Sequence, residues 1–287
     1  TQPRFSSLND RHMSRSILPK PFDGRDHRSF LWQESDRAAL LVHGFPGTPA
    51  EMRPLGIALK EAGWTVNGLM LPGLGADIEK LDQCTSRVWL DAVQQAIEEL
   101  KRQHSIILLV GYSLGGALTL SAASEQRPDG LVLLAPFWSF GDKWFSLLWP
   151  VMKICFPRLK PLKRADFAAS EVRRGLQRMF KDIDLDNPQI QEALRQVTVS
   201  SKPIEQIRQL GRRAFMQVAK IDMPTLIIQG SRDKVVPPLR TKRLINGFVS
   251  RVEYHEVDAG HDLIDPQSGA WDQVKERVLK FAASLRR

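Results

Sequence analysis

A serine between glycines is the first group in this chain whose type and spacing could do chemistry. Ser113 stands at the centre of the G-x-S-x-G segment 111–115, after the apolar run 105–110 and before the small-residue run 116–123. Such runs predict a buried strand followed by a closely packed helix. A serine on a sharp strand-to-helix turn presents its hydroxyl as a nucleophile, and small neighbours let the turn close. The spacing also arises by chance in loops rich in glycine and serine, so the flanking strand and helix carry the catalytic interpretation.

Acyl transfer by a serine also requires a base and an acid that orients the base. With the serine on a strand-to-helix turn, the acid is expected after a later strand and the histidine after the last one. Asp233 is the only carboxylate in the loop after the apolar run 225–229, and His261 follows the run 252–257. Each alone is more simply a turn aspartate or a surface histidine. Their joint placement predicts a triad of Ser113, Asp233 and His261.

Other titratable residues compete for roles in this site. Three carboxylates near the predicted base, Asp258, Asp262 and Asp265, lie too close to it in sequence to suit the orienting role. His43 follows an apolar strand, and we expect it to hold its own loop through hydrogen bonds. The negative charge of the reaction intermediate needs N–H donors. The predicted donors are the backbone N–H groups of Phe45 and Leu114.

Apolar runs alternating with amphipathic segments predict the elements that position these residues. This alternation indicates right-handed βαβ units and a mostly parallel central sheet flanked by helices. Thr48 and Pro49 suit the start of a helix that ends at Gly63. We expect strands near 30–34, 38–42, 64–71, 105–110, 130–135, 225–229 and 252–257, and helices near 49–62, 85–102, 116–123, 238–247 and 270–285.

The alternation stops after residue 136. Residues 137–221 have a helical pattern with no recognisable strand, which predicts an inserted cap or lid. The hydrolase core is then 28–136 with 222–287, and residues 1–27 form a polar N-terminal arm, extended or disordered. The aromatic start of the lid could line an apolar acyl pocket, or it could simply form the core of the insertion. The candidate substrate contacts are Phe137, Trp138, Phe140 and Trp144.

The chain is basic, with a net charge of +9 over 287 residues. Nine Lys or Arg and two acidic residues fall between Lys153 and Lys181, so the lid could meet an anionic membrane surface, although a solvated helix face explains the charges more simply. No recognisable nucleic-acid module accompanies them, and the lid is too interrupted by charges to span a bilayer. Two cysteines and no apparent signal peptide favour the cytoplasm, and no metal or organic cofactor has a role.

Four segments in order, 41–47, 111–116, 230–233 and 260–261, resemble the α/β-hydrolase superfamily. Within it the chain is similar to bacterial carboxylesterases, monoacylglycerol lipases and lysophospholipases. The resemblance implies that Ser113 attacks an ester carbonyl, that His261 moves the proton and that Asp233 stabilises the imidazolium. The implied substrate is a small-molecule or lipid ester with an apolar acyl group. The same triad also supports amide or carbon–carbon bond hydrolysis, and a non-catalytic lipid-binding protein on this fold is a third possibility.

Overall fold

The computed structural model describes residues 17–140, 148–149, 152–153 and 155–286. Within these ranges a seven-stranded sheet has the order β1-β3-β2-β4-β5-β8-β9, and its neighbouring pairs are parallel except β1 with β3 at one edge. The predicted mostly parallel sheet is therefore confirmed. Its strands are β1 (Phe30–Trp32), β2 (Arg37–Val42), β3 (Thr65–Leu69), β4 (Ile106–Tyr112), β5 (Gly130–Leu134), β8 (Thr225–Gly230) and β9 (Val252–Val257).

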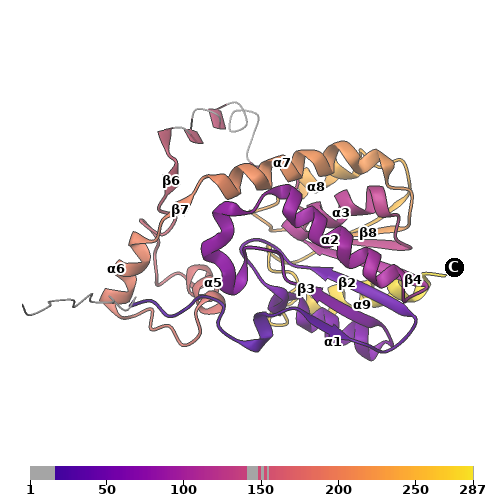
Figure 1. The fold of residues 1–287 in the computed structure, drawn as a ribbon, viewed down its shortest axis with the longest axis horizontal. Helices are drawn as coiled ribbons and strands as arrows, with labels where there is room; N and C mark the ends of the chain where they lie inside the picture. The colour runs from indigo at the N-terminus through magenta and orange to yellow at the C-terminus, as the bar shows by residue number, and fades with distance from the viewer. Residues whose placement is uncertain (1–16, 141–147, 150–151, 154, 287) are drawn as a thin grey trace, which may run out of the picture.

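Helices cover both faces of the sheet, as Figure 1 shows. Side chains of β4 alternate between the two faces: Leu109 packs in one apolar core, and Leu108 and Val110 pack in the other. This double burial explains why the central strands are continuously apolar. The first core lies under α2 (Ser86–Lys101), α3 (Leu114–Gln126), α7 (Lys202–Gln217) and α8 (Pro238–Ile245), and the second under α1 (Arg53–Glu61) and α9 (Trp271–Ser284).

The helix expected over 49–62 is divided into two parts. A 3-10 segment, η2 (Pro49–Met52), leads into α1, and the predicted cap is present because the Thr48 side chain accepts the Ala50 N–H at 3.4 Å. A second 3-10 segment, η3 (Gly75–Gln83), fills the region after β3 for which no helix was expected. None of the helices in the described ranges is long and apolar enough to cross a membrane.

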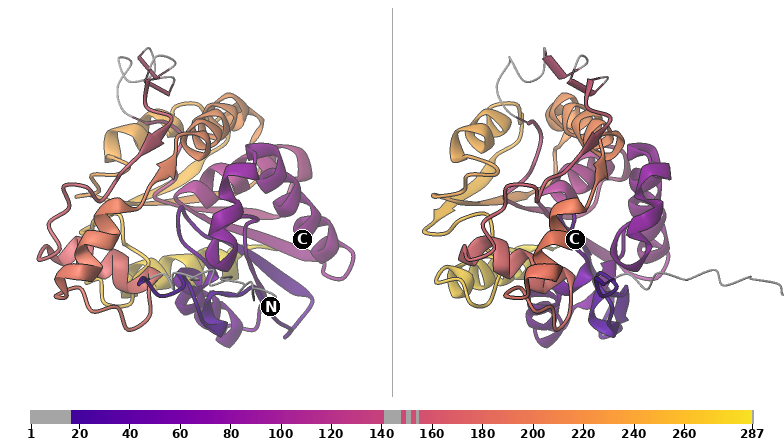
Figure 2. Two further views of the ribbon diagram at one scale, coloured as in Figure 1. Left: turned by 60° about the vertical axis from the view of Figure 1, so that its left-hand side comes forward. Right: turned by 90° about the vertical axis from the view of Figure 1, so that its left-hand side faces the viewer.

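The inserted segment has two differently packed parts. Its last helix, α7, lies against α3, and Ile207, Leu210 and Ala214 join the core beside the sheet. The helices α5 (Ser170–Met179) and α6 (Pro188–Gln196) instead surround a small core of their own, to the left of the sheet in Figure 1 and in the left view of Figure 2.

A short antiparallel pair corrects the expectation that the insertion contains no strand. β6 (Arg158–Leu159) pairs with β7 (Val199–Ser200). Strands of two residues are too short to show the alternation by which sequence patterns reveal strands.

The N-terminal segment, where the structure describes it from residue 17, packs on this insertion. Phe22 is buried, and its N–H donates to the Met179 carbonyl oxygen. Residues 17–27 thus include an anchored apolar side chain within the polar stretch predicted as an arm. Residues 1–16 of that stretch lie outside the described ranges.

Candidate active site

The turn between β4 and α3 holds Ser113 in a strained backbone conformation. Its φ of 52° and ψ of −114° lie where non-glycine residues are rare. The flanking glycines are required by close backbone approach: a Cβ on Gly115 would lie 2.1 Å from the Val42 carbonyl oxygen. A Cβ on Gly111 would lie 2.2 Å from Oγ1 of Thr119. The turn therefore has the form predicted for a nucleophile elbow.

Three predicted site residues from distant parts of the chain form one hydrogen-bonded series. The Ser113 hydroxyl lies 3.0 Å from Nε2 of His261, and Nδ1 of His261 lies 2.7 Å from Oδ2 of Asp233. In this arrangement the hydroxyl donates to the ring and the ring donates to the carboxylate. Ser113 and Asp233 are buried, and His261 is partly exposed. The geometry permits the ring to take the serine proton while the carboxylate fixes its tautomer.

Asp233 accepts hydrogen bonds from three groups besides His261. Its Oδ1 accepts the N–H groups of Val235 and Val236, each at 2.8 Å, while Oδ2 also accepts the Gln229 side-chain amide at 2.9 Å. Donors aimed at a buried carboxylate offset the loss of water. None of the rival carboxylates hydrogen-bonds to His261 in the described part of the chain: Asp258 pairs with Arg232 and Asp265 with Arg178.

Two residues that support the triad, Gln229 and Tyr112, were not predicted from the sequence. Gln229, fully buried, also accepts the Thr241 hydroxyl at 2.6 Å, and the one available signal was a polar residue at the end of an otherwise apolar strand. Tyr112 donates its hydroxyl to the His261 carbonyl oxygen at 2.9 Å. Burial raises the pKa of the Tyr112 phenol well above its ordinary value, so it remains a donor. Gln229 thus helps to position Asp233, and Tyr112 helps to position His261.

His43 organises the loop that carries one predicted oxyanion donor. Its Nδ1–H donates to the Gly44 carbonyl oxygen at 2.8 Å, and its Nε2 accepts the Leu71 N–H at 3.2 Å. Complete burial lowers the pKa of its imidazole to about 4, so the ring is neutral. The Gly44 carbonyl and the Phe45 N–H share one planar peptide unit. His43 therefore sets the direction of the Phe45 N–H.

Both predicted oxyanion donors border Ser113 in sequence or space. Leu114 is the first residue of α3, where helical N–H groups have no partner within the helix. Within the described ranges, neither its N–H nor that of Phe45 donates to a protein acceptor. Two unused donors of this kind are what a developing oxyanion requires.

A cleft of about 880 Å³ opens beside Ser113 and His261. Its walls are mostly apolar and come from both the core and the insertion. The insertion contributes side chains from α5 and the segment before it, and Phe22 comes from the N-terminal segment. Apolar members of this wall include Phe22, Phe45, Leu162, Val172, Leu176 and Ile264.

Three of the four aromatic residues predicted as substrate contacts, Phe137, Trp138 and Phe140, lie outside this cleft. Phe137 and Phe140 contact each other with ring centres 4.6 Å apart, and Phe137 is buried in the core. Trp138 stacks on Phe215 of α7, and its indole N–H donates to the Arg240 carbonyl oxygen. None of the three lines the cleft, and Trp144 lies outside the described residues. Their packing fastens the insertion to the core and gives no support to a substrate role.

In the described part of the chain, no cluster of three or more His, Cys, Asp or Glu side chains is arranged to hold a metal ion.

A family model described as serine aminopeptidase, S33, matches residues 33–264, a span that contains all three triad positions. The chain belongs to this family. The thermostable monoacylglycerol lipase of Bacillus sp. (strain H-257) is 30% identical over 265 residues, which is 88% of this chain and 93% of that protein. The carboxylesterase of Bacillus subtilis (strain 168) is 34% identical over 117 residues, or 40% and 44% of the two chains.

Solved structures support the fold of this S33 chain. The monoacylglycerol lipase of Paleococcus ferrophilus superposes with a TM-score of 0.67 at 20% identity, covering 90% of this chain and 98% of that one. A structure from work on the metagenome-derived lipolytic enzymes LipS and LipT gives a TM-score of 0.70 at 22% identity, over 93% and 99%. The chain is thus a serine hydrolase of the α/β-hydrolase fold, homologous to a monoacylglycerol lipase and a carboxylesterase.

Proposed function

We propose that this enzyme hydrolyses carboxylic esters of apolar acyl groups through an acyl-enzyme on Ser113. The observation that carries the proposal is the hydrogen-bonded series Ser113–His261–Asp233 at the side of an apolar cleft. Both relatives named above are ester hydrolases by their names, and the first covers nearly the whole chain.

In the proposed reaction, Ser113 Oγ attacks the ester carbonyl carbon while Nε2 of His261 takes its proton. Asp233 stabilises the resulting imidazolium, which then gives the proton to the leaving alcohol. The N–H groups of Phe45 and Leu114 bind the oxyanion of each tetrahedral intermediate. Water, deprotonated by His261, then attacks the acyl-enzyme and releases the acid. The mechanism requires no cofactor.

The substrate class follows from the cleft. Its apolar wall suits an acyl chain, and its size suits a lipid-sized ester, so a monoacylglycerol is the leading candidate. The family description names an aminopeptidase, which keeps amide hydrolysis as the alternative. The apolar character of the cleft wall favours the acyl ester.

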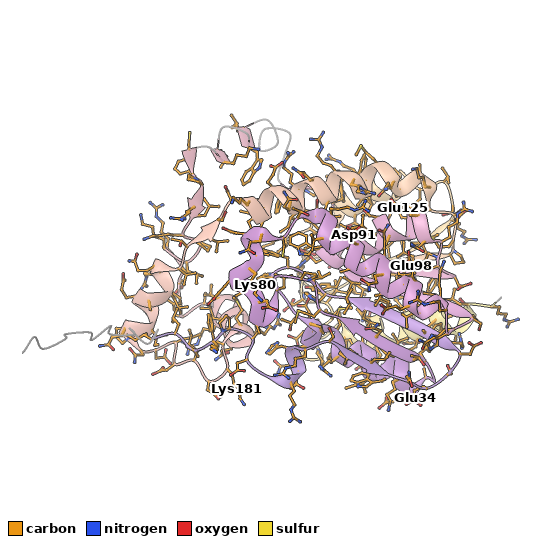
Figure 3. All side chains as sticks on the ribbon, in the orientation of Figure 1. Glu34, Lys80, Asp91, Glu98, Glu125 and Lys181 are labelled. Atoms are coloured by element: carbon orange, nitrogen blue, oxygen red, sulfur yellow. The ribbon has the colours of Figure 1, made fainter. Side chains whose placement is uncertain are left out.

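We also propose contact with an anionic membrane through the insertion. Leu148 and Phe156 are 51% and 58% exposed, next to Lys153 and Arg158 in the same stretch. Lys181, also in the insertion, lies in Figure 3 apart from the labelled carboxylates Asp91 and Glu98 of α2 and Glu125 of α3. Apolar and cationic side chains together favour binding to anionic lipid. Sedimentation with phosphatidylglycerol vesicles tests this, and equal binding to phosphatidylcholine would contradict it.

Cys84 and Cys155 are both free thiols. Free thiols suit a reducing compartment, which agrees with the predicted cytoplasmic location.

A fluorophosphonate probe tests the proposed nucleophile. The wild type should be labelled and Ser113→Ala should not. An unlabelled wild type would favour a lipid-binding protein without catalysis, and equal labelling of the variant would exclude Ser113 as the nucleophile.

Substrate rates then test the ester and the acyl pocket. Among p-nitrophenyl esters from acetyl to palmitoyl, kcat/KM should rise beyond acetyl, and 1-monoacylglycerols should be cleaved. Faster cleavage of an aminoacyl p-nitroanilide than of any ester would instead support the aminopeptidase alternative.

A further inference from the structure

Glu51 is a carboxylic acid residue in the wall of the cleft to which the mechanism above gives no role. It lies in η2, and its Oε1 accepts the Gly44 N–H at 2.6 Å. It also lines the cleft together with Ser113 and His261. A hydrogen bond from a backbone N–H to a carboxylate is roughly twice as strong as one between neutral groups. Glu51 thus binds the loop that carries the Phe45 N–H.

The chain leaves room for this carboxylate at one position. A Cβ on Gly47 would lie 2.5 Å from both carboxylate oxygens of Glu51. Such a contact is impossible without displacing the carboxylate. The absence of a side chain at Gly47 therefore allows Glu51 to reach Gly44.

Gly44 is held on both of its sides. Its N–H is bound by Glu51 and its carbonyl oxygen by His43. Glycine has more backbone freedom than any other residue, so a loop that turns at glycine needs external contacts to keep one conformation. The two contacts fix the peptide units on either side of the Gly44 Cα. The second of those units contains the Phe45 N–H.

The loop also passes directly against the nucleophile. A Cβ on Gly44 would lie 3.2 Å from the Tyr112 ring and 3.3 Å from Cβ of Ser113. A small rotation at Gly44 would therefore change where the Phe45 N–H lies relative to Oγ of Ser113. Misplacement of reacting groups by about 1 Å can lower a rate about a hundredfold.

The buried position of Glu51 makes its ionised form less favourable. Burial raises the pKa of Glu51 to about 7, although the Gly44 hydrogen bond and the charges of Arg178 and His261 lower it in part. A protonated carboxyl group still has a carbonyl oxygen that accepts an N–H. The contact with Gly44 is thus available in both protonation states, and the loop stays bound across the pH range in which the group titrates.

We propose that Glu51 is a positioning residue for the oxyanion hole: by binding the Gly44 N–H, it holds the Gly44–Phe45 peptide where the Phe45 N–H meets the oxyanion. The inference rests on the proposed ester hydrolysis, because it assigns an effect on that reaction. It adds a residue from η2 to the site. Glu51 acts through Gly44 and does not exchange protons with the substrate.

Two substitutions separate the acceptor from the charge. Glu51→Ala removes the acceptor, and we expect kcat for p-nitrophenyl butyrate to fall about ten- to a hundredfold with little change in KM, as part of an oxyanion contact is lost. Glu51→Gln keeps a carbonyl oxygen for the Gly44 N–H and should retain most of the activity. Glu61→Ala is the matched control, because Glu61 is an exposed glutamate at the end of α1.

Gly47→Ala tests the same contact without touching Glu51. The added methyl group should displace the carboxylate and lower kcat in the same way, which keeps the proposal testable if Glu51→Ala does not fold. All variants are assayed well below their midpoints of thermal unfolding.

A boronic acid inhibitor reports on the oxyanion site separately from turnover. Its tetrahedral adduct places an oxygen where the oxyanion forms, so its affinity should fall in parallel with kcat in Glu51→Ala and Gly47→Ala. A purely structural role would leave this affinity unchanged.

Wild-type kcat in Glu51→Ala, or equal losses in Glu51→Ala and Glu51→Gln, would overturn the inference. Either result would leave the proposed hydrolysis standing. A wild type that is not labelled by the fluorophosphonate probe would overturn the proposed function itself.

Discussion

Acid should remove the stability that the buried His43 contributes to this enzyme. His43 keeps one ring nitrogen as an acceptor for the Leu71 N–H, so a proton on that nitrogen would face another N–H. With burial, this agrees with a pKa lowered from the ordinary 6.5 to about 4. In the unfolded chain the same ring takes up a proton near pH 6.5. Between these two values the ring binds more protons in the unfolded state, so the contribution of His43 to the free energy of unfolding falls as the pH falls.

The size of the effect follows from the two pKa values. Each pKa unit corresponds to about 1.4 kcal/mol, so His43 should account for about 3 kcal/mol of stability that is present above pH 6.5 and lost by pH 4. Glu51, whose pKa is raised, works in the opposite direction. A comparison of proteins that all contain Glu51 cancels its contribution.

Urea unfolding at several pH values between 7 and 4 measures the effect. His43→Gln should be less stable than the wild type at pH 7, and the difference should shrink by about 3 kcal/mol at pH 4. His104→Gln, which keeps both His43 and Glu51, should show the same pH dependence as the wild type. Nitrogen chemical shifts of the His43 ring should show the neutral Nδ1–H tautomer at pH 7. A stability difference between wild type and His43→Gln that is independent of pH would refute the reasoning.

Two further substitutions test other parts of the site. Asp233→Asn should lower kcat on the order of ten-thousand-fold, since the amide favours the wrong tautomer of His261; a loss of less than tenfold would remove Asp233 from the triad. Gly115→Ala should destabilise the protein by about 1–3 kcal/mol in chemical denaturation, since its methyl group meets the Val42 carbonyl oxygen. An unchanged midpoint for Gly115→Ala would show that α3 can move away from β2.

The sequence predicted the site residues whose positions follow from the order of strands and loops along the chain. Ser113, Asp233 and His261 each follow an apolar run, and parallel strands bring the ends of such runs to the same edge of the sheet. The α/β-hydrolase fold predicted from this order is confirmed by the structure and by the family match. The hydrogen bonds of the triad are present, and the catalytic roles of its members stay predictions until they are assayed.

Other parts could not be read from local patterns. Glu51 was not predicted as a site residue, because its partner is the backbone of Gly44, which leaves no signature in the sequence. The aromatic start of the insertion suggested a lipid pocket, yet Trp138 and Phe137 pack on the core. Aromatic side chains serve packing and ligand binding equally well, so composition alone could not separate the two roles.

The pairing of β6 with β7 gives the insertion a narrow point of attachment. Arg158 lies opposite Ser200, so the chain between them leaves and returns at neighbouring positions. That stretch has its own small apolar core and supplies one wall of the cleft. The stretch between β6 and β7 is therefore a compact unit whose two ends lie side by side. Replacing residues 160–198 by the equivalent stretch of a relative should transfer preference for the acyl chain while the triad stays in place.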